Sequence, residues 1–224
     1  MAAFHPGLQD LPAEIGVFPL PGALLLPQGR LPLNVFERRY LNLVEDALGQ
    51  GRMFGMVQPD SSLPAGETGP GLFRTGCLGR LSSFSETEDG RFLITLTGVI
   101  RFRVVAELPP HRLHRRMRVE YRGFEADLDL GARPQLADRA GLLAALRAFF
   151  RHRGIEANWT GIEQTPDDAL LTTLCMVCPF EPREKQALLD VATPDERARL
   201  LLGLLLMGSQ PGAHNEPPPG TRPS

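Results

Sequence analysis

Apolar and polar residues alternate with a period of two through much of the segment 92–121. Every second residue is apolar in 92–96, 100–104 and 117–121, and the intervening residues of the last two segments are charged. This pattern is typical of an antiparallel sheet with one face on the core and one in water. Asp89-Gly90 precedes the first segment, so we expect a hairpin there with a type I′ turn.

Shorter patterns organise the N-terminal part. Leu41, Val44 and Leu48 lie three and four residues apart, so a helix is expected over 38–48. The stretch 59–71 carries three prolines and three glycines, which predicts an exposed loop. Short apolar runs predict three further strands, at 15–18, 31–36 and 53–57.

The period changes in the second part, where 133–207 is rich in alanine and leucine. One apolar face runs from Leu142 to Phe150 and predicts a helix that Gly154 ends. The tetrapeptides Thr165-Pro166-Asp167-Asp168 and Thr193-Pro194-Asp195-Glu196 each predict a helix start, with threonine as the N-cap. The fold class is therefore α+β, a β-rich half followed by a helical half.

These shifts in composition predict four parts of the chain. The last is rich in proline and glycine, with almost nothing to bury, so we expect it to be disordered. The parts are an N-terminal extension 1–9, a β-rich subdomain 10–125, an α-helical subdomain 126–207 and a tail 208–224.

Composition narrows the class of protein. The net charge of −2 gives no chain-wide reason to expect nucleic acid or an anionic membrane as a partner. No segment reaches the roughly 18 uninterrupted apolar residues of a membrane span, and the N-terminus is unlike a secretory signal. Three cysteines fit a reducing compartment. We therefore expect a soluble cytoplasmic protein.

Common catalytic motifs are absent from the sequence. No G-x-x-x-x-G-K-[ST], G-x-S-x-G or H-E-x-x-H occurs. The single lysine, Lys185, lies in a charged helix start, so we interpret it as solvated rather than as half of a Ser–Lys dyad. The sequence thus predicts a protein that is not an enzyme and needs no cofactor.

Cys175 and Cys178 have the C-x-x-C spacing of redox pairs and of half a zinc site. A zinc site would need two more ligands, and His111 and His114 are the one candidate pair. The motif stands at the end of a predicted helix, so we favour two small buried core residues and no metal.

The segment 111–118 holds four arginines and two histidines. Arginine clusters can contact phosphate, so one hypothesis is a patch that binds RNA or a nucleotide. No aromatic residues interleave with it and acidic residues follow closely, which favours a solvated loop and edge strand instead. The patch would consist of Arg112, Arg115, Arg116 and Arg118.

An ordered set of motifs resembles the Lon protease N-terminal (substrate-binding) domain family over residues 12–207. The departures from its pattern, at Asn34, Val35 and the two C-x-x-C cysteines, leave the fold unchanged. The motifs are Phe18-Pro19-Leu20-Pro21-Gly22-Ala23, Leu26-Pro27, Leu33 to Tyr40 (LNVFERRY), Phe54-Gly55-Met56-Val57, Gly76 to Arg80, Gly98 to Arg103, Pro179-Phe180, Glu184 to Leu189 and Glu196-Arg197.

The resemblance implies a free-standing bacterial member of that family, with a PUA-like pseudo-barrel joined to a helical bundle. The ATPase and Ser–Lys peptidase modules of full-length Lon proteases do not follow here. The implied function is recognition of unfolded or tagged polypeptides, as an adaptor or chaperone-like protein that acts with a protease complex or alone. No catalytic residues carry over.

Two groups of residues are candidates for this role. An unfolded segment needs a concave apolar surface, and the Pro-rich stretch 18–27 could line one, although the same residues could instead close the barrel core. The candidate contacts are Phe18, Leu20, Leu24, Leu25 and Leu26. A second group, Phe36, Glu37, Arg39 and Tyr40, is interpreted as a structural cluster that fixes the start of the following helix.

Overall fold

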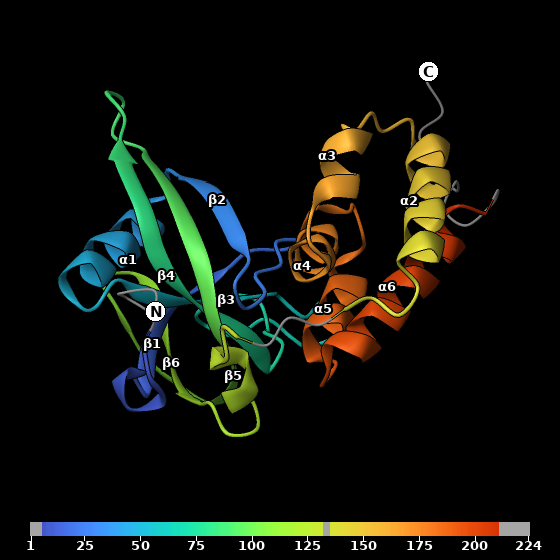
Figure 1. Ribbon diagram of the computed structural model, residues 1–224. Coiled ribbons are helices and arrows are strands. Elements are labelled where there is room, and N and C mark those ends of the chain that lie inside the picture. Colours follow the sequence, from blue (N-terminus) through green and yellow to red (C-terminus); the bar gives the residue numbers. More distant parts are fainter. Residues whose placement is uncertain (1–5, 132–134, 211–224) are drawn as a thin grey trace, which may run out of the picture.

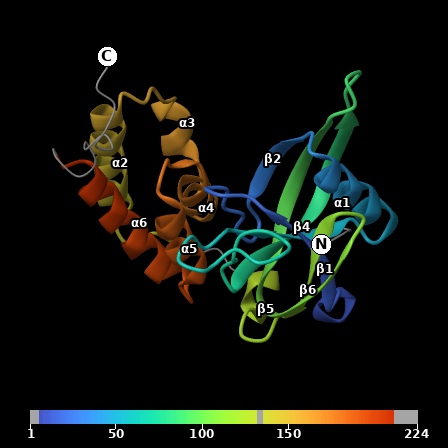
Figure 2. The same ribbon diagram turned by 180° about the vertical axis from the view of Figure 1, so that it is seen from behind.

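Six strands form one sheet in the computed structural model, which describes residues 6–131 and 135–210 (Figure 1). A 3-10 turn, η1 (Leu8–Asp10), precedes the first strand. The strands are β1 (Glu14–Pro19), β2 (Arg30–Val35), β3 (Met53–Val57), β4 (Thr75–Glu86), β5 (Phe92–His111) and β6 (His114–Glu120). The helices that follow lie to one side of the sheet in both views (Figure 2), so the predicted α+β fold is confirmed.

The sheet closes into a barrel because β5 is long enough to pair with three strands, β2, β4 and β6. The strand order is β2-β5-β4-β3-β1-β6, and a further pairing of β5 with β6 joins the ends. The pairing of β5 with β6 has register shifts after Val104 and after Leu108. Such bulges bend a strand, which lets β5 continue from its pairing with β2 and β4 to its pairing with β6. β2 pairs with β5 alone and stands outside the closed part, at the sheet edge.

The hairpin predicted at Asp89-Gly90 is present, but its turn differs from the prediction. β4 ends at Glu86 and β5 begins at Phe92. Gly90 has φ 77° and its amide donates to the Thr87 carbonyl, whereas Asp89 is not among the residues with positive φ. A type I′ turn needs positive φ at both central residues, so the loop is one in which only the glycine is left-handed.

α1 (Arg38–Gly49) lies on the outside of the barrel against β1, β3 and β6. Its buried residues include Tyr40, Leu43 and Val44, as the predicted apolar face requires. The Tyr40 ring stacks on Phe18 of β1 with centroids 3.8 Å apart. This contact fixes the helix start against the sheet.

Five helices complete the part of the chain that the structure describes, and three of the predicted helix boundaries can be compared directly. They are α2 (Arg139–Arg153), α3 (Trp159–Gln164), α4 (Asp167–Val177), α5 (Pro182–Asp190) and α6 (Pro194–Gly208), preceded by a 3-10 turn, η2 (Glu125–Leu128). Gly154 ends α2 with φ 64°, as predicted. The predicted N-cap at Thr165 is wrong, because its hydroxyl donates to the Gly161 carbonyl in the last turn of α3.

Thr193 does cap its helix. Its hydroxyl accepts from the Glu196 amide at 3.2 Å, and the Glu196 carboxylate accepts from the Thr193 amide. We expect Thr193→Ala to cost about 1 kcal/mol of unfolding free energy, or roughly 2–4 °C in Tm. Thr165→Ala, which removes no cap, should change it by less than about 0.5 kcal/mol. Equal thermal shifts for the two variants would contradict this assignment.

The core is divided between two clusters. The smaller lies inside the closed barrel around Leu78, Ile100 and Phe102. The larger extends from the open face of the sheet through Leu24–26 into the helices, so sheet and helices share one apolar interior. No helix in the described parts of the chain is long and apolar enough to cross a membrane. The predicted domain boundaries stay predictions, and residues 1–5 and 211–224 of the predicted extension and tail lie outside the described residues.

Candidate functional site

Arg101 joins the barrel to the helices. It lies on β5, and its side chain is 5% exposed beside Asp127 of η2, which is 10% exposed. Nε and Nη2 donate to the two Asp127 oxygens at 2.9 Å each. Nη1 and Nη2 also donate to the carbonyls of Leu189, Val191 and Ala192, at and after the end of α5. The guanidinium thus satisfies carbonyl groups that a helix end leaves without partners.

The interpretation of Lys185 as a solvated residue is wrong. Lys185 is 7% exposed, and Nζ donates to the Gly22 carbonyl at 2.8 Å and to the Met176 carbonyl at 3.1 Å. Burial lowers the pKa of its ammonium. The lysine ties the turn after β1 to α4 and α5, so it has a structural role in the contact between the two halves.

Gln58 makes a second link of the same kind. It is 2% exposed, accepts from the Gly22 amide and donates to the Pro182 carbonyl at the start of α5. Gln186 of α5 in turn donates to the Thr75 carbonyl of β4. Buried polar groups with satisfied hydrogen bonds specify one arrangement of the parts they join. The two halves therefore meet through a defined polar contact.

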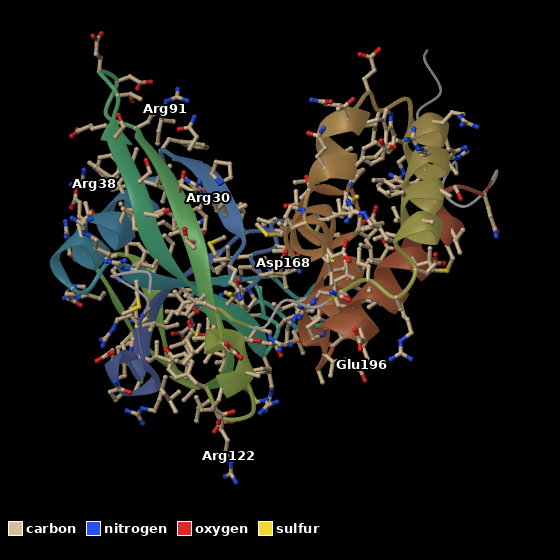
Figure 3. All side chains as sticks on the ribbon, in the orientation of Figure 1. Arg30, Arg38, Arg91, Arg122, Asp168 and Glu196 are labelled. Carbon is tan, nitrogen blue, oxygen red and sulfur yellow. The ribbon has the colours of Figure 1, made fainter. Side chains whose placement is uncertain are left out.

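A cleft of about 380 Å³ opens between the sheet and the helices beside this contact. One wall is the loop Pro27–Gly29 with Arg30 of β2, and the opposite wall is α4 from Asp168 to Val177. Its floor comes from η2 and the start of α6. Figure 3 labels Arg30 on the sheet side and Asp168 on the helix side. The apolar lining residues are Pro27, Ala126, Ala169, Leu171, Met176, Val177 and Pro194.

The charged groups of the cleft are mixed in sign. Asp127 is neutralised by Arg101, whereas Arg30 and Asp168 have no hydrogen-bond or ion-pair partner among the described residues. Arg197 is 8% exposed and donates from Nε to the Leu188 carbonyl. Burial lowers the pKa of Arg197. A cleft with apolar walls and both charges suits a polypeptide better than a polyanion.

The Pro-rich stretch 18–27 lies in the core and ends at Pro27 in the cleft wall. Leu24, Leu25 and Leu26 are at most 2% exposed and Phe18 is 5% exposed, whereas Leu20 is half-buried. All of them pack in the larger core cluster. They are thus core residues, but of the cluster that sheet and helices share and not of the closed barrel. Direct contact between these leucines and a polypeptide stays a prediction, and it would require the stretch to move.

The predicted cluster at the start of α1 is only partly internal. Tyr40 is buried and donates to the Pro19 carbonyl, and the Arg39 guanidinium lies 4.5 Å from its ring centroid. Burial raises the pKa of the Tyr40 hydroxyl. Arg39 pairs with Glu37 at 2.8 Å, but both side chains are 47% exposed. Phe36 is 63% exposed and packs in neither core cluster.

Each of the four arginines of 111–118 pairs with a carboxylate. The segment forms the β5–β6 hairpin, and β6 pairs with both β1 and β5, so the prediction of an edge strand is wrong. The ion pairs, 2.5–3.0 Å long, join Arg112 to Glu45 and Asp46, Arg115 to Glu107, and both Arg116 and Arg118 to Glu14. These pairs reduce the charge available to a phosphate.

Cys175 and Cys178 lie in the helical part of the core, at most 1% exposed. Burial raises the pKa of each thiol to about 12, so both stay protonated near neutral pH. His111 and His114 lie instead on the β5–β6 hairpin near Asp46 of α1. Within residues 6–131 and 135–210, no three His, Cys, Asp or Glu side chains are placed to hold a metal ion.

Sequence reasoning reached only one edge of the cleft, at Pro27 of the stretch 18–27, and missed the wall formed by α4 and the role of Arg101. The alternation in 100–104 predicted that Arg101 faces water, which is wrong, because β5 is buried on both faces from Gly98 to Phe102 and Arg101 is 4% exposed. A charged residue in such a strand needs a partner of opposite charge. The walls, by contrast, come from segments about 140 residues apart.

Comparison with known proteins gives a consistent result. Residues 14–206 match the family described as "ATP-dependent protease La (LON) substrate-binding domain". Lon protease 2 of Myxococcus xanthus is 29% identical over 106 residues, which are 45% of this chain and 12% of that protein. The Lon protease of Anaeromyxobacter dehalogenans is 26% identical over 129 residues, 55% of this chain and 15% of that protein. The chain thus spans only a small part of the curated relatives.

Solved structures agree with the family match. A Lon N-terminal domain protein from Xanthomonas campestris has a TM-score of 0.58 and 26% identity, covering 85% of this chain and 97% of that one. The N-terminal domain of the Mycobacterium avium complex Lon protease also has a TM-score of 0.58, covering 86% of this chain and 97% of that one. At 14% identity, the second likeness concerns the fold alone.

Proposed function

Because this chain belongs to the ATP-dependent protease La (LON) substrate-binding domain family, we propose that it binds unfolded polypeptide and carries out no chemistry on it. The cleft between sheet and helices is the proposed site. Its apolar walls can cover apolar side chains, and Arg30 and Asp168, which have no partner in the described parts of the chain, can bind polar ones. This combination is the observation that carries the proposal.

Val177 provides the most direct test. It ends α4, lines the cleft and is 61% exposed. Burying a valine side chain is worth about 1.5 kcal/mol or more, which is roughly tenfold in affinity. We therefore expect Val177→Asp to weaken binding of a reduced, carboxymethylated protein by about tenfold or more, measured by fluorescence anisotropy.

Val105 supplies the matched control, because it is 58% exposed on β5 and does not line the cleft. Val105→Asp adds the same charge and should leave the affinity within about twofold. Equal loss in the two variants would point to a charge effect rather than to the cleft. No binding of any unfolded protein by the folded wild-type chain would contradict the proposed function itself.

The finer role that we propose is that of an adaptor or chaperone-like protein, which presents bound chains to a protease or holds them alone. The buried free cysteines fit a reducing compartment, so the proposed location is the cytoplasm. The alternative role in RNA or nucleotide binding stays a prediction. The ion pairs of its four arginines favour the polypeptide hypothesis.

A further inference from the structure

β2 has one edge that no other segment of the described chain pairs with. The strand is joined to β5 along one side and ends the sheet on the other. In Figures 1 and 2 it lies between the rest of the sheet and the helices. Its first residue, Arg30, lines the cleft, so the edge and the cleft are continuous.

The register tells which backbone groups this edge presents. The Gly98 amide donates to the Gly29 carbonyl, so the backbone of residue 29 faces β5. In an antiparallel pair the residues alternate, so 31, 33 and 35 also face β5, while 30, 32 and 34 face outward. Pro32 fits this assignment, since a proline facing β5 would cost the ladder a hydrogen bond.

The outward residues are Arg30, Pro32 and Asn34, and all three are exposed. They offer the amides of Arg30 and Asn34 and the carbonyls of all three. This alternating row of donors and acceptors is what an extended chain can match, and a folded surface or a phosphate chain cannot. Pro32 leaves a gap in the donors at the middle of the row but keeps its carbonyl, so the three acceptors are continuous.

The side chains of β2 indicate which residues a strand added at this edge would need. Leu31 and Leu33 are half-buried on the inner face, so they leave apolar surface for alternate residues of an incoming strand. On the outer face, the guanidinium of Arg30 has no partner within residues 6–131 and 135–210, so it favours a carboxylate opposite it. Asn34 adds a neutral polar partner.

We propose that an extended segment of the bound polypeptide adds as a further strand to the outer edge of β2, with apolar residues toward Leu31 and Leu33 and an acidic residue toward Arg30. This inference rests on the proposed function and specifies its binding mode. Proline-rich clients should bind poorly, since they lack the amides that the edge carbonyls need.

Backbone methylation of a client peptide tests this mode directly. The probe is a fluorescent ten-residue peptide in which apolar residues alternate with polar ones, including a glutamate. Two derivatives carry N-methyl groups on alternate amides, one on the odd positions and one on the even. In a strand pairing only one set of amides faces β2, so one derivative should lose about tenfold or more in affinity and the other less than about threefold. Equal affinities of the two derivatives would overturn the proposal.

Asn34→Pro is the matching change in the protein. It removes an outward amide and leaves the bonds to β5 intact, so it should weaken the unmethylated peptide about three- to tenfold. Asn34→Ala keeps the amide and should stay within about twofold. If Asn34→Pro fails to fold, the peptide pair still decides. Tight binding of a carboxymethylated protein together with equal binding of both methylated peptides would refute the edge mode while leaving the proposed function standing.

Discussion

Replacing Arg101 by methionine is expected to lower the free energy of unfolding by about 3–5 kcal/mol. The change leaves the buried Asp127 carboxylate with the backbone amide of residue 101 but without its charged partner, and it removes the donors to the carbonyls after α5. Urea titration at neutral pH, followed by circular dichroism, measures the effect.

Arg103 on the same strand is the matched control. Its ion pair with Glu120 is 3.6 Å long, and the two side chains are 50% and 46% exposed. An exposed pair contributes little, so Arg103→Met should cost less than about 1 kcal/mol. A similar loss in both variants would mean that burial of the Arg101 pair is not what stabilises the fold.

A second substitution separates the effect of the buried charge from that of the lost hydrogen bonds. Asp127→Leu in the Arg101→Met background removes the unpaired carboxylate and should recover part of the stability. No recovery would assign the loss to the three carbonyls of Leu189, Val191 and Ala192 instead. Arg101 joins the barrel to these carbonyls of the helical half. Arg101→Met should therefore also weaken polypeptide binding at the cleft between the two halves.

Local patterns predicted most elements because those elements depend on nearby residues. The run 53–57 coincides with β3, and the helix predicted over 38–48 is α1 to within one residue. The two tetrapeptides that begin with Thr-Pro-Asp show the limit of prediction from local patterns. Both have the same capping chemistry, yet only Thr193 caps a helix, because the Thr165 hydroxyl is already bonded within α3. Local sequence does not reveal that competition.

Tertiary contact explains the larger errors. Lys185 lies in a charged helix start, and only the approach of Gly22, 163 residues away in sequence, makes it a buried donor. The cleft has the same origin, since its two walls are brought together by the polar contact of Arg101, Gln58 and Lys185. A single sequence contains no local pattern for such a contact, although a charged residue inside a buried strand is a hint of one.

Gly98→Ala is expected to be the second large loss, about 3 kcal/mol. A Cβ on Gly98 would overlap the carbonyl oxygen of Leu26 and lie 2.7 Å from the carbon of that carbonyl. Backbone cannot rotate out of the way as a long side chain can. Gly98 also exchanges hydrogen bonds with Gln28 and Gly29. The clash would therefore push the whole stretch 26–29, one wall of the cleft, off β5.

Binding should fall with stability in this variant, even at temperatures where the chain stays folded, because the displaced stretch includes Pro27, Gln28 and Gly29 of the cleft wall. Gly203→Ala is the control, since a Cβ at that position in α6 would lie within 4 Å of no described atom beyond its chain neighbours and the backbone of its own helix. It should stabilise the chain by about 0.5–1 kcal/mol and leave binding unchanged. A stable Gly98→Ala chain with full affinity would show that the close approach of residues 26–29 to β5 does not shape the cleft.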